Sequence, residues 1–437
     1  MPLPSLKETI AAIATPPGKG AVGIIRLSGE DALKVAAQIW RGKSPLSMTG
    51  GQFTHGQIVD LETGELLDDA LLLVFRSPNS YTGQDACELQ THGSRAVLRK
   101  VLHALLAAGA RAAEPGEFTL RAYLNGRMDL AQAEAVLSLV ESESDAARRQ
   151  ALRGLSKELS QRIAGISARL LDLLAHIQAL LDYPEEGVEP HAAGHVLRQA
   201  LDQIDTLLKG AKAGKLISQG ARLAIVGAPN AGKSSLLNAL LGYERAIVAP
   251  VAGTTRDYLE APLEISGVPL VAVDTAGVRE TDDPVERAGV ERALAVAREA
   301  DIVLYLADQS CARTQAPDLP WDRTIKVATK VDLPAEWSDS EFLKVSSRTG
   351  TGLGLLQDAI HKHLLGSAPE GEVWITNERH TEALREAKER LLEGLSAPED
   401  LMGLSVQAAL EALNRIVGKD VPEEVIARVF RNFCVGK

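Results

Sequence analysis

The chain has 437 residues, of which 45% are hydrophobic and 24% charged, a composition typical of a soluble globular protein with room for two to four domains. The formal net charge of −11 argues against a general nucleic-acid coat, although a local basic face or a basic partner could still bring the chain to RNA. The cysteines Cys87, Cys311 and Cys434 are widely separated and favour neither a disulfide framework nor a zinc site, which indicates a reducing cytosol. We expect no signal peptide, because the amino terminus lacks a basic stretch followed by an apolar core. We also expect no membrane span, because no apolar run approaches ~20 residues.

The first part of the chain, up to about Phe118, is predicted to be a compact α+β domain. Short β-rich runs alternate there with two helical patterns, and glycine and proline separate them. The strands are expected at 9–15, 20–28, 57–60, 70–76 and 86–90, and the helices at 30–40 and 95–108. Nothing in this segment alone specifies a reaction.

Long amphipathic helices are predicted from residue 128 to 181, where apolar residues recur mostly in steps of three and four. Another helix is expected at 193–208, followed by a short hinge containing lysine and glycine at 210–220. Helices return at the carboxyl end, at 378–395, 405–417 and 423–432. We expect the helices before and after the middle of the chain to pack together, so that the middle is an insertion into a helical domain.

That middle segment opens with a complete phosphate-loop motif. A buried strand is predicted at 223–226 and a helix from 235, and residues 227–234 between them have the pattern G-x-x-x-x-G-K-[ST]. Gly227 and Gly232 let the backbone curl so that its N–H groups point at phosphate oxygens. Lys233 would reach the β- and γ-phosphates, and the Ser234 hydroxyl would ligate Mg²⁺. The motif predicts binding of a nucleoside triphosphate.

Further motifs follow in the order found in GTPases. Thr255, within Gly-Thr-Thr-Arg-Asp at 253–257, is the natural second Mg²⁺ ligand and γ-phosphate sensor. The strand predicted at 270–273 leads into Asp274, which would hold Mg²⁺ through water, and Gly277, whose N–H would meet the γ-phosphate. Buried strands at 302–306 and 324–328 complete an α/β module with a mostly parallel sheet.

The loop after residue 328 is a variant of the guanine-binding motif Asn-Lys-x-Asp. Asp332 can accept hydrogen bonds from the N1 hydrogen and the exocyclic amine of guanine, a pairing that adenine cannot offer. Thr329 replaces the asparagine; its hydroxyl could tie the loops together but reaches purine N7 less well. After a strand at 342–345, Ser346-Ser347-Arg348 supplies the last base-contacting loop. These motifs together predict GTP as the ligand.

Two positions bear on mechanism. Val278 stands where many GTPases carry a glutamine that orients the attacking water, so another residue must do this; Glu286 is a candidate, and the alternative is a solvated acidic loop. Asn230 in the phosphate loop could ligate a monovalent cation near the β–γ bridge, in which case no catalytic arginine is needed. The alternative for Asn230 is a hydrogen bond that stabilises the loop.

The chain as a whole resembles the bacterial MnmE (TrmE) family of tRNA-modification GTPases. The resemblance rests on three stretches outside the GTPase motifs, which are residues 14–29 (ATPPGKGAVGIIRLSG), residues 114–118 with 124–134 (EPGEF and LNGRMDLAQAE), and the terminal Phe-Cys-Val-Gly-Lys at 433–437. It implies an α+β folate-binding and dimerisation domain at 1–118 and an all-α helical domain at 119–218 and 369–437. A Ras-like α/β P-loop G domain is inserted at 219–368.

The resemblance also implies a cytoplasmic homodimer that acts with a flavin-dependent partner, MnmG (GidA). The partner carries FAD, and together they form a heterotetramer. The family uses a reduced folate with a one-carbon unit, 5-formyl- or 5,10-methylene-tetrahydrofolate, to add an aminomethyl or carboxymethylaminomethyl group at C5 of the wobble uridine of certain tRNAs. GTP hydrolysis drives G-domain dimerisation and a conformational change.

Site residues carried over by motif fall into four groups. Glu286 orients the water; Ser234 and Thr255 bind Mg²⁺; Asn230, Ala249, Val251 and Thr254 bind K⁺; and Arg26, Glu88, Arg127 and Lys437 bind folate. The GTP-binding set is Gly227, Asn230, Ala231, Gly232, Lys233, Ser234, Ser235, Ala249, Thr254, Thr255, Asp274, Thr275, Ala276, Gly277, Thr329, Lys330, Asp332, Ser346, Ser347 and Arg348.

Two rival functions are compatible with the GTPase motifs alone. A regulatory or ribosome-assembly GTPase would act through partner binding, but we would expect it to show a basic RNA-binding appendage. A membrane-remodelling GTPase would need a membrane segment, whereas the long helices at 128–181 are patterned to pack on one another.

Overall fold

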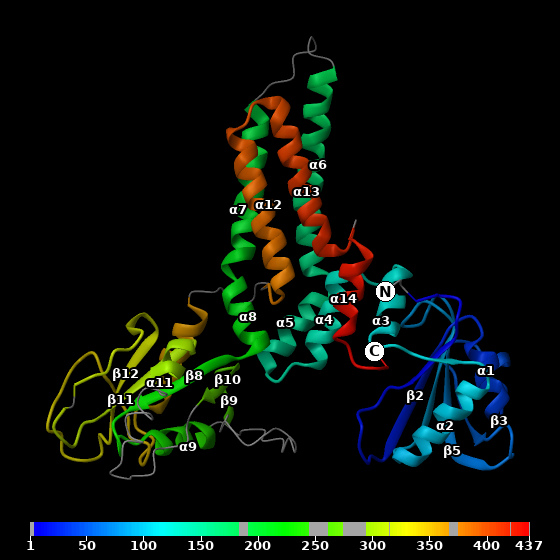
Figure 1. Ribbon diagram of the computed structural model, residues 1–437, viewed down its shortest axis with the longest axis horizontal. Coiled ribbons are helices and arrows are strands. Elements are labelled where there is room, and N and C mark those ends of the chain that lie inside the picture. The colour runs from blue at the N-terminus through cyan, green and yellow to red at the C-terminus, as the bar shows by residue number, and fades with distance from the viewer. Residues whose placement is uncertain are drawn as a thin grey trace. The chain divides into compact units, whose positions relative to one another are not determined.

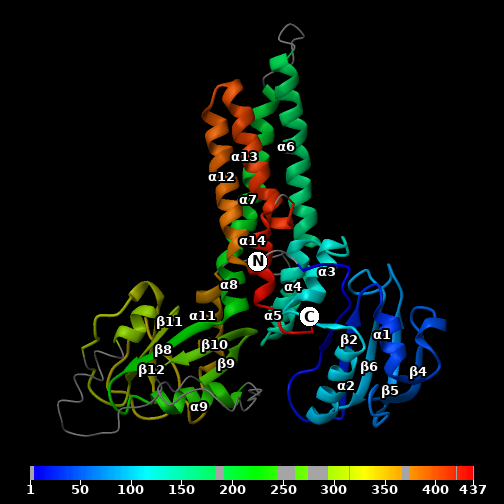
Figure 2. The same cartoon turned by 45° about the vertical axis from the view of Figure 1, so that its right-hand side comes forward.

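The computed structural model describes residues 4–182, 191–243, 261–273, 294–313, 315–366, 375–419 and 421–436. The chain divides into two compact units, whose elements are labelled in Figure 1 and seen from a second direction in Figure 2. Unit 1 consists of Met1–Leu137 together with Asn414–Lys437, and unit 2 is Ser138–Leu413. The domain boundaries expected from the sequence, at 118, 218 and 368, stay a prediction.

Unit 1 is built on a seven-stranded sheet in the order β3-β4-β5-β6-β2-β1-β7. Neighbouring strands pair antiparallel, except that β7 pairs parallel with β1. The five predicted strands are present, and two short ones were missed because two or three residues show no alternation. The strands are β1 (Ile10–Ile13), β2 (Val22–Ser28), β3 (Trp40–Gly42), β4 (Phe53–Val59), β5 (Leu66–Phe75), β6 (Ala86–His92) and β7 (Arg111–Ala112).

Two helices cover one face of this sheet, α1 (Ala32–Ile39) and α2 (Arg95–Ala107) (Figure 1). Alternate residues of β2, among them Ile25 and Leu27, are buried against them in one apolar core. Since side chains alternate along a strand, Arg26 lies on the opposite face. Strand β2 therefore turns Ile25 and Leu27 to the apolar core and Arg26 to the other face of the sheet.

The carboxyl end of the chain belongs to unit 1. The helix α14 (Glu423–Arg431) packs on α3 (Glu117–Leu124), with the ring centroids of Phe430 and Tyr123 6.2 Å apart. The Tyr123 hydroxyl also donates to the carbonyl of Gly418 at 2.6 Å. Residues almost 300 positions apart in the chain are therefore joined in one fold.

A buried ionic cluster anchors α3. Glu117 and Arg121 are both buried and paired at 2.9 Å, and Arg111 adds a second bond to Glu117 at 2.6 Å. Arg121 also donates to the carbonyl of Glu8 at 2.7 Å and to the side chain of Gln84 at 3.1 Å. These buried charges are stabilised because each has several hydrogen-bond partners.

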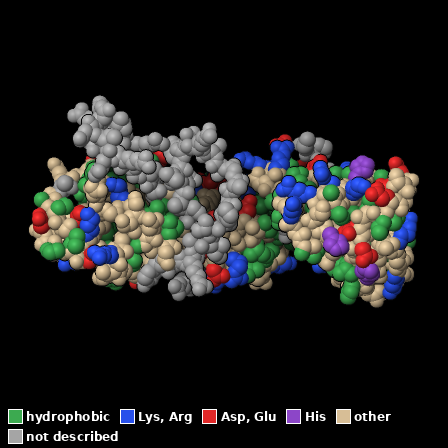
Figure 3. Space-filling view, turned by 90° about the horizontal axis from the view of Figure 1, so that it is seen from below, with side chains coloured by type: hydrophobic (Ala, Val, Ile, Leu, Met, Phe, Trp, Pro, Cys, Tyr) green, Lys and Arg blue, Asp and Glu red, His purple; other side chains and the backbone are tan. Residues whose placement is uncertain are grey.

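The opposite face of the sheet is exposed over β4 and β5. Phe53 is 71% exposed and Leu71 36% exposed. Figure 3 shows histidines close to acidic side chains on the surface of unit 1. Two ion pairs of unit 1, His55 with Asp69 and His92 with Asp68, each have a distance of 2.8 Å. The exposed apolar side chains Phe53 and Leu71, set among polar ones, mark this face as a candidate interface.

The helices of unit 2 confirm the long amphipathic patterns of the sequence. Although far apart in the chain, α7 and α12 pack together, and α6 packs on α7 (Figures 1 and 2). An ion pair of 2.6 Å between Lys388 and Asp205 adds to the contact between α12 and α7. The helices are α5 (Asp145–Leu155), α6 (Glu158–Asp182), α7 (His191–Lys209) and α12 (Glu378–Ser396). The helix α4 (Leu130–Val140) begins in unit 1, and α13 (Glu399–Val417) ends in it.

One of these helices, α6, is long and apolar enough to span a membrane by length and composition alone, with a mean hydropathy of 1.3 over 18 residues. We had expected no such segment. Its buried residues recur in steps of three and four, which is the pattern of an amphipathic helix with one face packed on its neighbours. They are Leu159, Ile163, Ile166, Leu170, Leu173 and Ile177.

The predicted hinge at 210–220 is wrong, because residues Ala211–Gln219 form helix α8. Gly210 and Gly220 lie just outside its two ends, and Gly220 has a positive φ of 77°, as glycines that end helices often do. Leu216 and Ile217 are buried. The glycines that suggested a hinge therefore mark the limits of a helix.

The second sheet lies in unit 2, in the order β13-β12-β11-β8-β10-β9. All neighbouring strands pair parallel except β9 with β10. An apolar cluster lies on each face of the sheet. The helices α9 (Lys233–Tyr243) and α11 (Leu353–Leu365) contribute to one of these clusters. This confirms the predicted α/β module; β9 was not anticipated. The strands are β8 (Ala221–Gly227), β9 (Ala261–Ile265), β10 (Val268–Val273), β11 (Ile302–Asp308), β12 (Thr324–Thr329) and β13 (Leu343–Lys344).

Candidate functional site

The phosphate loop joins the end of β8 to the start of α9. Asn230 and Gly232 have positive φ angles of 60° and 92°, so the backbone curls between strand and helix as the motif predicts. At Gly227 the constraint is different: a Cβ atom there would lie 2.6 Å from the carbonyl oxygen of Leu306 on β11. This glycine is required for close packing of β8 on β11.

The Lys233 side chain lies back over the loop. Its Nζ donates to the carbonyls of Gly227 at 2.8 Å and Ala228 at 2.9 Å. Burial lowers the pKa of this ammonium group. An ammonium has three donors, so among the described residues one remains beyond these two carbonyls. Ser234 and Ser235 are exposed in the first turn of α9, whose positive end favours anions.

Thr329 links the base-binding loop to the phosphate loop. Its hydroxyl donates to the carbonyl of Ala231 at 2.7 Å, with the carbonyl of Ala307 at 3.3 Å, and the residue is only 3% exposed. The sequence suggested that this hydroxyl could tie the loops together, and the structure contains that bond.

Lys330, the next residue, has a positive φ of 58° and an ion pair with Asp308 at 2.6 Å. Although burial alone would raise the pKa of Asp308, hydrogen bonds from Lys330 and Ser310 hold it below its ordinary value. Sequence reasoning missed Asp308. The signal available was its position at the end of β11, beside the base-binding loop that follows β12.

Asp332 is exposed, and its Oδ1 accepts a hydrogen bond of 2.7 Å from the buried Ser346 hydroxyl. This bond, together with the charge of Arg348, holds the pKa of Asp332 below its ordinary value. The carboxylate therefore stays ionised and can accept two hydrogen bonds from a guanine edge. Three residues predicted to read the base, from two loops, are thus brought together.

Many of the predicted site residues lie outside the described residues. These are Ala249, Val251, Thr254, Thr255, Asp274, Thr275, Ala276, Gly277, Glu286 and Lys437. Their roles stay predictions.

Unit 1 holds a second polar site, at Arg26. Arg26 pairs with Glu88 across strands β2 and β6, with Nε and Nη2 each 2.8 Å from the same carboxylate oxygen. Nη1 of Arg26 donates to the carbonyl of Gly436 at 3.2 Å. Gly436 has a φ of 96°, and a Cβ there would lie 2.7 Å from the Ile13 carbonyl oxygen. The penultimate residue of the chain is therefore part of this site.

Aromatic rings flank the Arg26 guanidinium, whose Cζ lies 5.7 Å from the ring centroids of both Tyr81 and Phe118. Arg127 lies near the loop between β5 and β6, because a Cβ atom built on Gly83 in that loop would be 3.2 Å from Cγ of Arg127. Two predicted folate ligands, Arg26 and Glu88, thus bond to each other, which sequence reasoning did not anticipate.

Known proteins match this chain over nearly its whole length. The model for the GTP-binding protein TrmE N-terminus matches residues 9–127, and the model for the MnmE helical domain matches residues 130–434. A tRNA modification GTPase MnmE of Thermus thermophilus is 64% identical over 433 residues, which cover 99% of this chain and 100% of the relative. The chain belongs to the MnmE family. The relative of the same name from Aquifex aeolicus is 41% identical over 453 residues, covering 99% of this chain and 100% of its own.

Family membership confirms the predicted fold class of a TrmE-type amino-terminal domain, an MnmE helical domain and an α/β nucleotide module. It also makes the chain a member of a GTPase family. Among solved structures, the G domain of the T. maritima FeoB iron transporter aligns with 33% of this chain and 98% of its own, at 26% identity. Its TM-score of 0.24 is too low to carry an argument.

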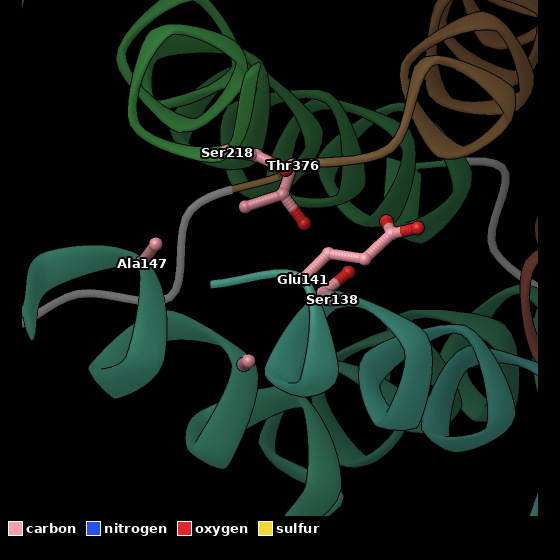
Figure 4. Close-up of a pocket in the computed structure, with 6 residues that line it drawn as sticks. Ser138, Glu141, Ala147, Ser218 and Thr376 are labelled. Carbon is pink, nitrogen blue, oxygen red and sulfur yellow. The ribbon is translucent and has the colours of Figure 1, made fainter. Parts of the chain in front are cut away.

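A small cavity of about 20 Å³ lies in the helical part of this MnmE family member. Figure 4 shows Ser138 and Glu141 on one side of it and Ser218 and Thr376 on the other. A polar cavity of this volume holds about one water molecule, so it is too small for a substrate.

Proposed function

We propose that this chain is a GTP hydrolase that acts in the modification of tRNA. The observation that carries the proposal is the hydrogen-bonded base-binding loop, in which Ser346 orients Asp332 and Thr329 is tied to the phosphate loop. This base-binding loop belongs to a chain that is 64% identical to a relative named tRNA modification GTPase MnmE. A carboxylate held ionised at this position selects guanine over adenine, because adenine has no N1 hydrogen or amine at C2 to donate.

The phosphates would be bound by the loop backbone and by Lys233. Two of its three donors are engaged by loop carbonyls, and the third would bind a phosphate oxygen. Ser234 and Thr255 would hold Mg²⁺, since hydroxyl oxygen is a ligand this hard cation accepts. Bound Mg²⁺ would supply positive charge to the β- and γ-phosphates.

Hydrolysis also requires an oriented water and a stabilised leaving group. Glu286 is proposed to orient the water in place of the missing glutamine. Asn230, Thr254 and the backbone of Ala249 and Val251 are proposed to hold K⁺. The amide oxygen of Asn230 is a suitable ligand for K⁺. The left-handed backbone of Asn230 places this residue within the curl of the phosphate loop.

We propose that the Arg26 site binds a reduced folate. An arginine and a carboxylate between aromatic rings suit a flat, hydrogen-bonding ring system that bears carboxylates. Arg127 and the terminal Lys437 would add positive charge. The folate would supply the one-carbon unit for the modification.

The proposed reaction adds an aminomethyl or carboxymethylaminomethyl group at C5 of the wobble uridine. The flavin-dependent MnmG (GidA) would be the partner and carry the FAD, in a cytoplasmic heterotetramer. The exposed sheet face at Phe53 and Leu71 supports a homodimer joined through unit 1, because association would bury it.

The test is binding of 5-formyltetrahydrofolate, by calorimetry, to the intact chain and to one lacking Gly436 and Lys437. We expect tight binding that weakens at least tenfold on truncation, because the Arg26–Gly436 bond is lost. GTP hydrolysis is measured on both chains as a control and should be equal. No folate binding by either chain, with hydrolysis intact, would favour the regulatory GTPase instead.

A further inference from the structure

The hydroxyl of Thr329 has a single hydrogen, and its surroundings determine where that hydrogen points. The two nearest polar partners, the carbonyls of Ala231 at 2.7 Å and Ala307 at 3.3 Å, are both acceptors. A hydroxyl between acceptors must act as the donor to one of them. Since the residue is 3% exposed, this hydrogen is committed within the protein.

Purine N7 is a hydrogen-bond acceptor and can be recognised only by a donor. An asparagine at position 329 would offer an amide with two donors, whereas the threonine has none to spare. Asp332 is ionised and accepts only, so it cannot contact N7 either. The remaining side chain of the motif, Lys330, directs its ammonium group to Asp308 at 2.6 Å, towards the end of β11.

We propose that this chain recognises guanine through its N1 and exocyclic-amine edge, by Asp332, and that the Thr329 hydroxyl does not read N7. The inference rests on the proposed GTPase function and deepens it by naming which atoms of the base are recognised. Guanine and adenine both carry N7, so the missing contact leaves discrimination between them intact. The role of Thr329 is to hold the base-binding loop on the phosphate loop.

The test compares GDP with 7-deaza-GDP, in which a C–H group replaces N7. Both are titrated into the full chain by calorimetry, with Mg²⁺ and K⁺ present and ADP as a control. We expect the two dissociation constants to agree within about twofold. A hydrogen bond to N7 would make 7-deaza-GDP weaker by up to about tenfold, and that result would overturn the inference.

The control separates this inference from the proposed function. If GDP does not bind, or if ADP binds equally well, the GTPase proposal itself fails. If GDP binds and ADP does not, the function stands, and the ratio of 7-deaza-GDP to GDP alone decides whether N7 is read.

Thr329→Val removes the hydroxyl with little change in shape. We expect this variant to weaken the binding of GDP and of 7-deaza-GDP by the same factor, because the Ala231 carbonyl loses its hydrogen-bond partner and the base-binding loop is held less firmly. If instead only GDP weakens, the hydroxyl reads N7 and the inference is wrong. Thr329→Asn, which adds an amide donor, is expected to make GDP bind about five- to tenfold more tightly than 7-deaza-GDP.

Discussion

The hydroxyl of Ser346 donates a hydrogen bond of 2.7 Å to Oδ1 of Asp332, so a residue after β13 orients the carboxylate that follows β12. Removing it frees the carboxylate to rotate and raises its pKa towards the ordinary value. We expect Ser346→Ala to weaken GDP binding about fivefold at pH 7, because the carboxylate is no longer held in its binding orientation. Calorimetry checks this, with the exposed Ser396→Ala as the control.

The pH dependence of this binding follows from the same bond. Because the pKa of Asp332 is lowered, the carboxylate stays ionised at pH values where an ordinary carboxylate begins to be protonated. GDP affinity should therefore stay constant through that range and fall only as the pH drops through the lowered pKa. In Ser346→Ala the loss should begin at higher pH. Identical profiles for the two proteins would contradict the proposed role of Ser346.

Glu286→Ala should leave GTP affinity unchanged and slow hydrolysis by about 10²–10⁴-fold, if this carboxylate orients the attacking water. Phosphate release at saturating GTP measures the effect. The matched control is Glu280→Ala, which removes an acidic residue from the same loop. Equal turnover in the two variants would exclude Glu286 from the mechanism.

Replacing K⁺ with Na⁺ should slow hydrolysis strongly, because the smaller ion fits a site shaped for K⁺ poorly. Asn230→Ala should be slow in both salts, since the proposed side-chain ligand is gone. The readout is the ratio of initial rates in KCl and NaCl at equal ionic strength. Equal wild-type rates in the two salts would rule out the cation role of Asn230.

Arg26→Lys keeps the positive charge but loses the planar group that contacts both Glu88 and the Gly436 carbonyl. We expect affinity for 5-formyltetrahydrofolate to fall about tenfold or more, with GDP binding unaffected. The control is Arg41→Lys, an exposed arginine that donates only to neighbouring backbone carbonyls. Unchanged folate affinity in Arg26→Lys would remove Arg26 from the site.

Glu117→Gln should destabilise unit 1 by about 3–5 kcal/mol, because two arginines lose their charged partner. Burial alone would raise the pKa of Glu117, but hydrogen bonds from Arg111, the backbone N–H of Glu114 and Arg121 hold this pKa below its ordinary value. Its contribution to stability is therefore present above that value and is lost as the pH falls through the lowered pKa. Hydrogen exchange of α3 in the full chain measures this, and the exposed Glu114→Gln should exchange like wild type.

Much of this architecture could be predicted from local sequence pattern. The phosphate loop, the parallel strands and the amphipathic helices depend on spacing within a few residues, and they lie where the pattern placed them. The error at α8 came from treating Gly210 and Gly220 as flexible points, when glycines also flank well-formed helices.

The contacts that complete the sites could not be predicted in this way, because they join distant residues. The pairing of Asp308 with Lys330 needs the order of β11 and β12, and the resemblance grouped Arg26 with Lys437 without indicating the bond to Gly436. These pairs depend on strand order and on the return of the chain to its first domain. Thr329 is intermediate: its hydroxyl was a candidate tie, but its acceptor became apparent only in the fold.

Unit 1 contains both ends of the chain, with all of Ser138–Leu413 synthesised between its two parts. On a ribosome that adds ~5–20 residues per second, the first part must wait tens of seconds for the last helix and for Gly436. The bond from Arg26 to Gly436 can therefore form only after all of Ser138–Leu413 has been synthesised. A chain interrupted within Ser138–Leu413 would therefore lack Gly436 and with it one contact of Arg26.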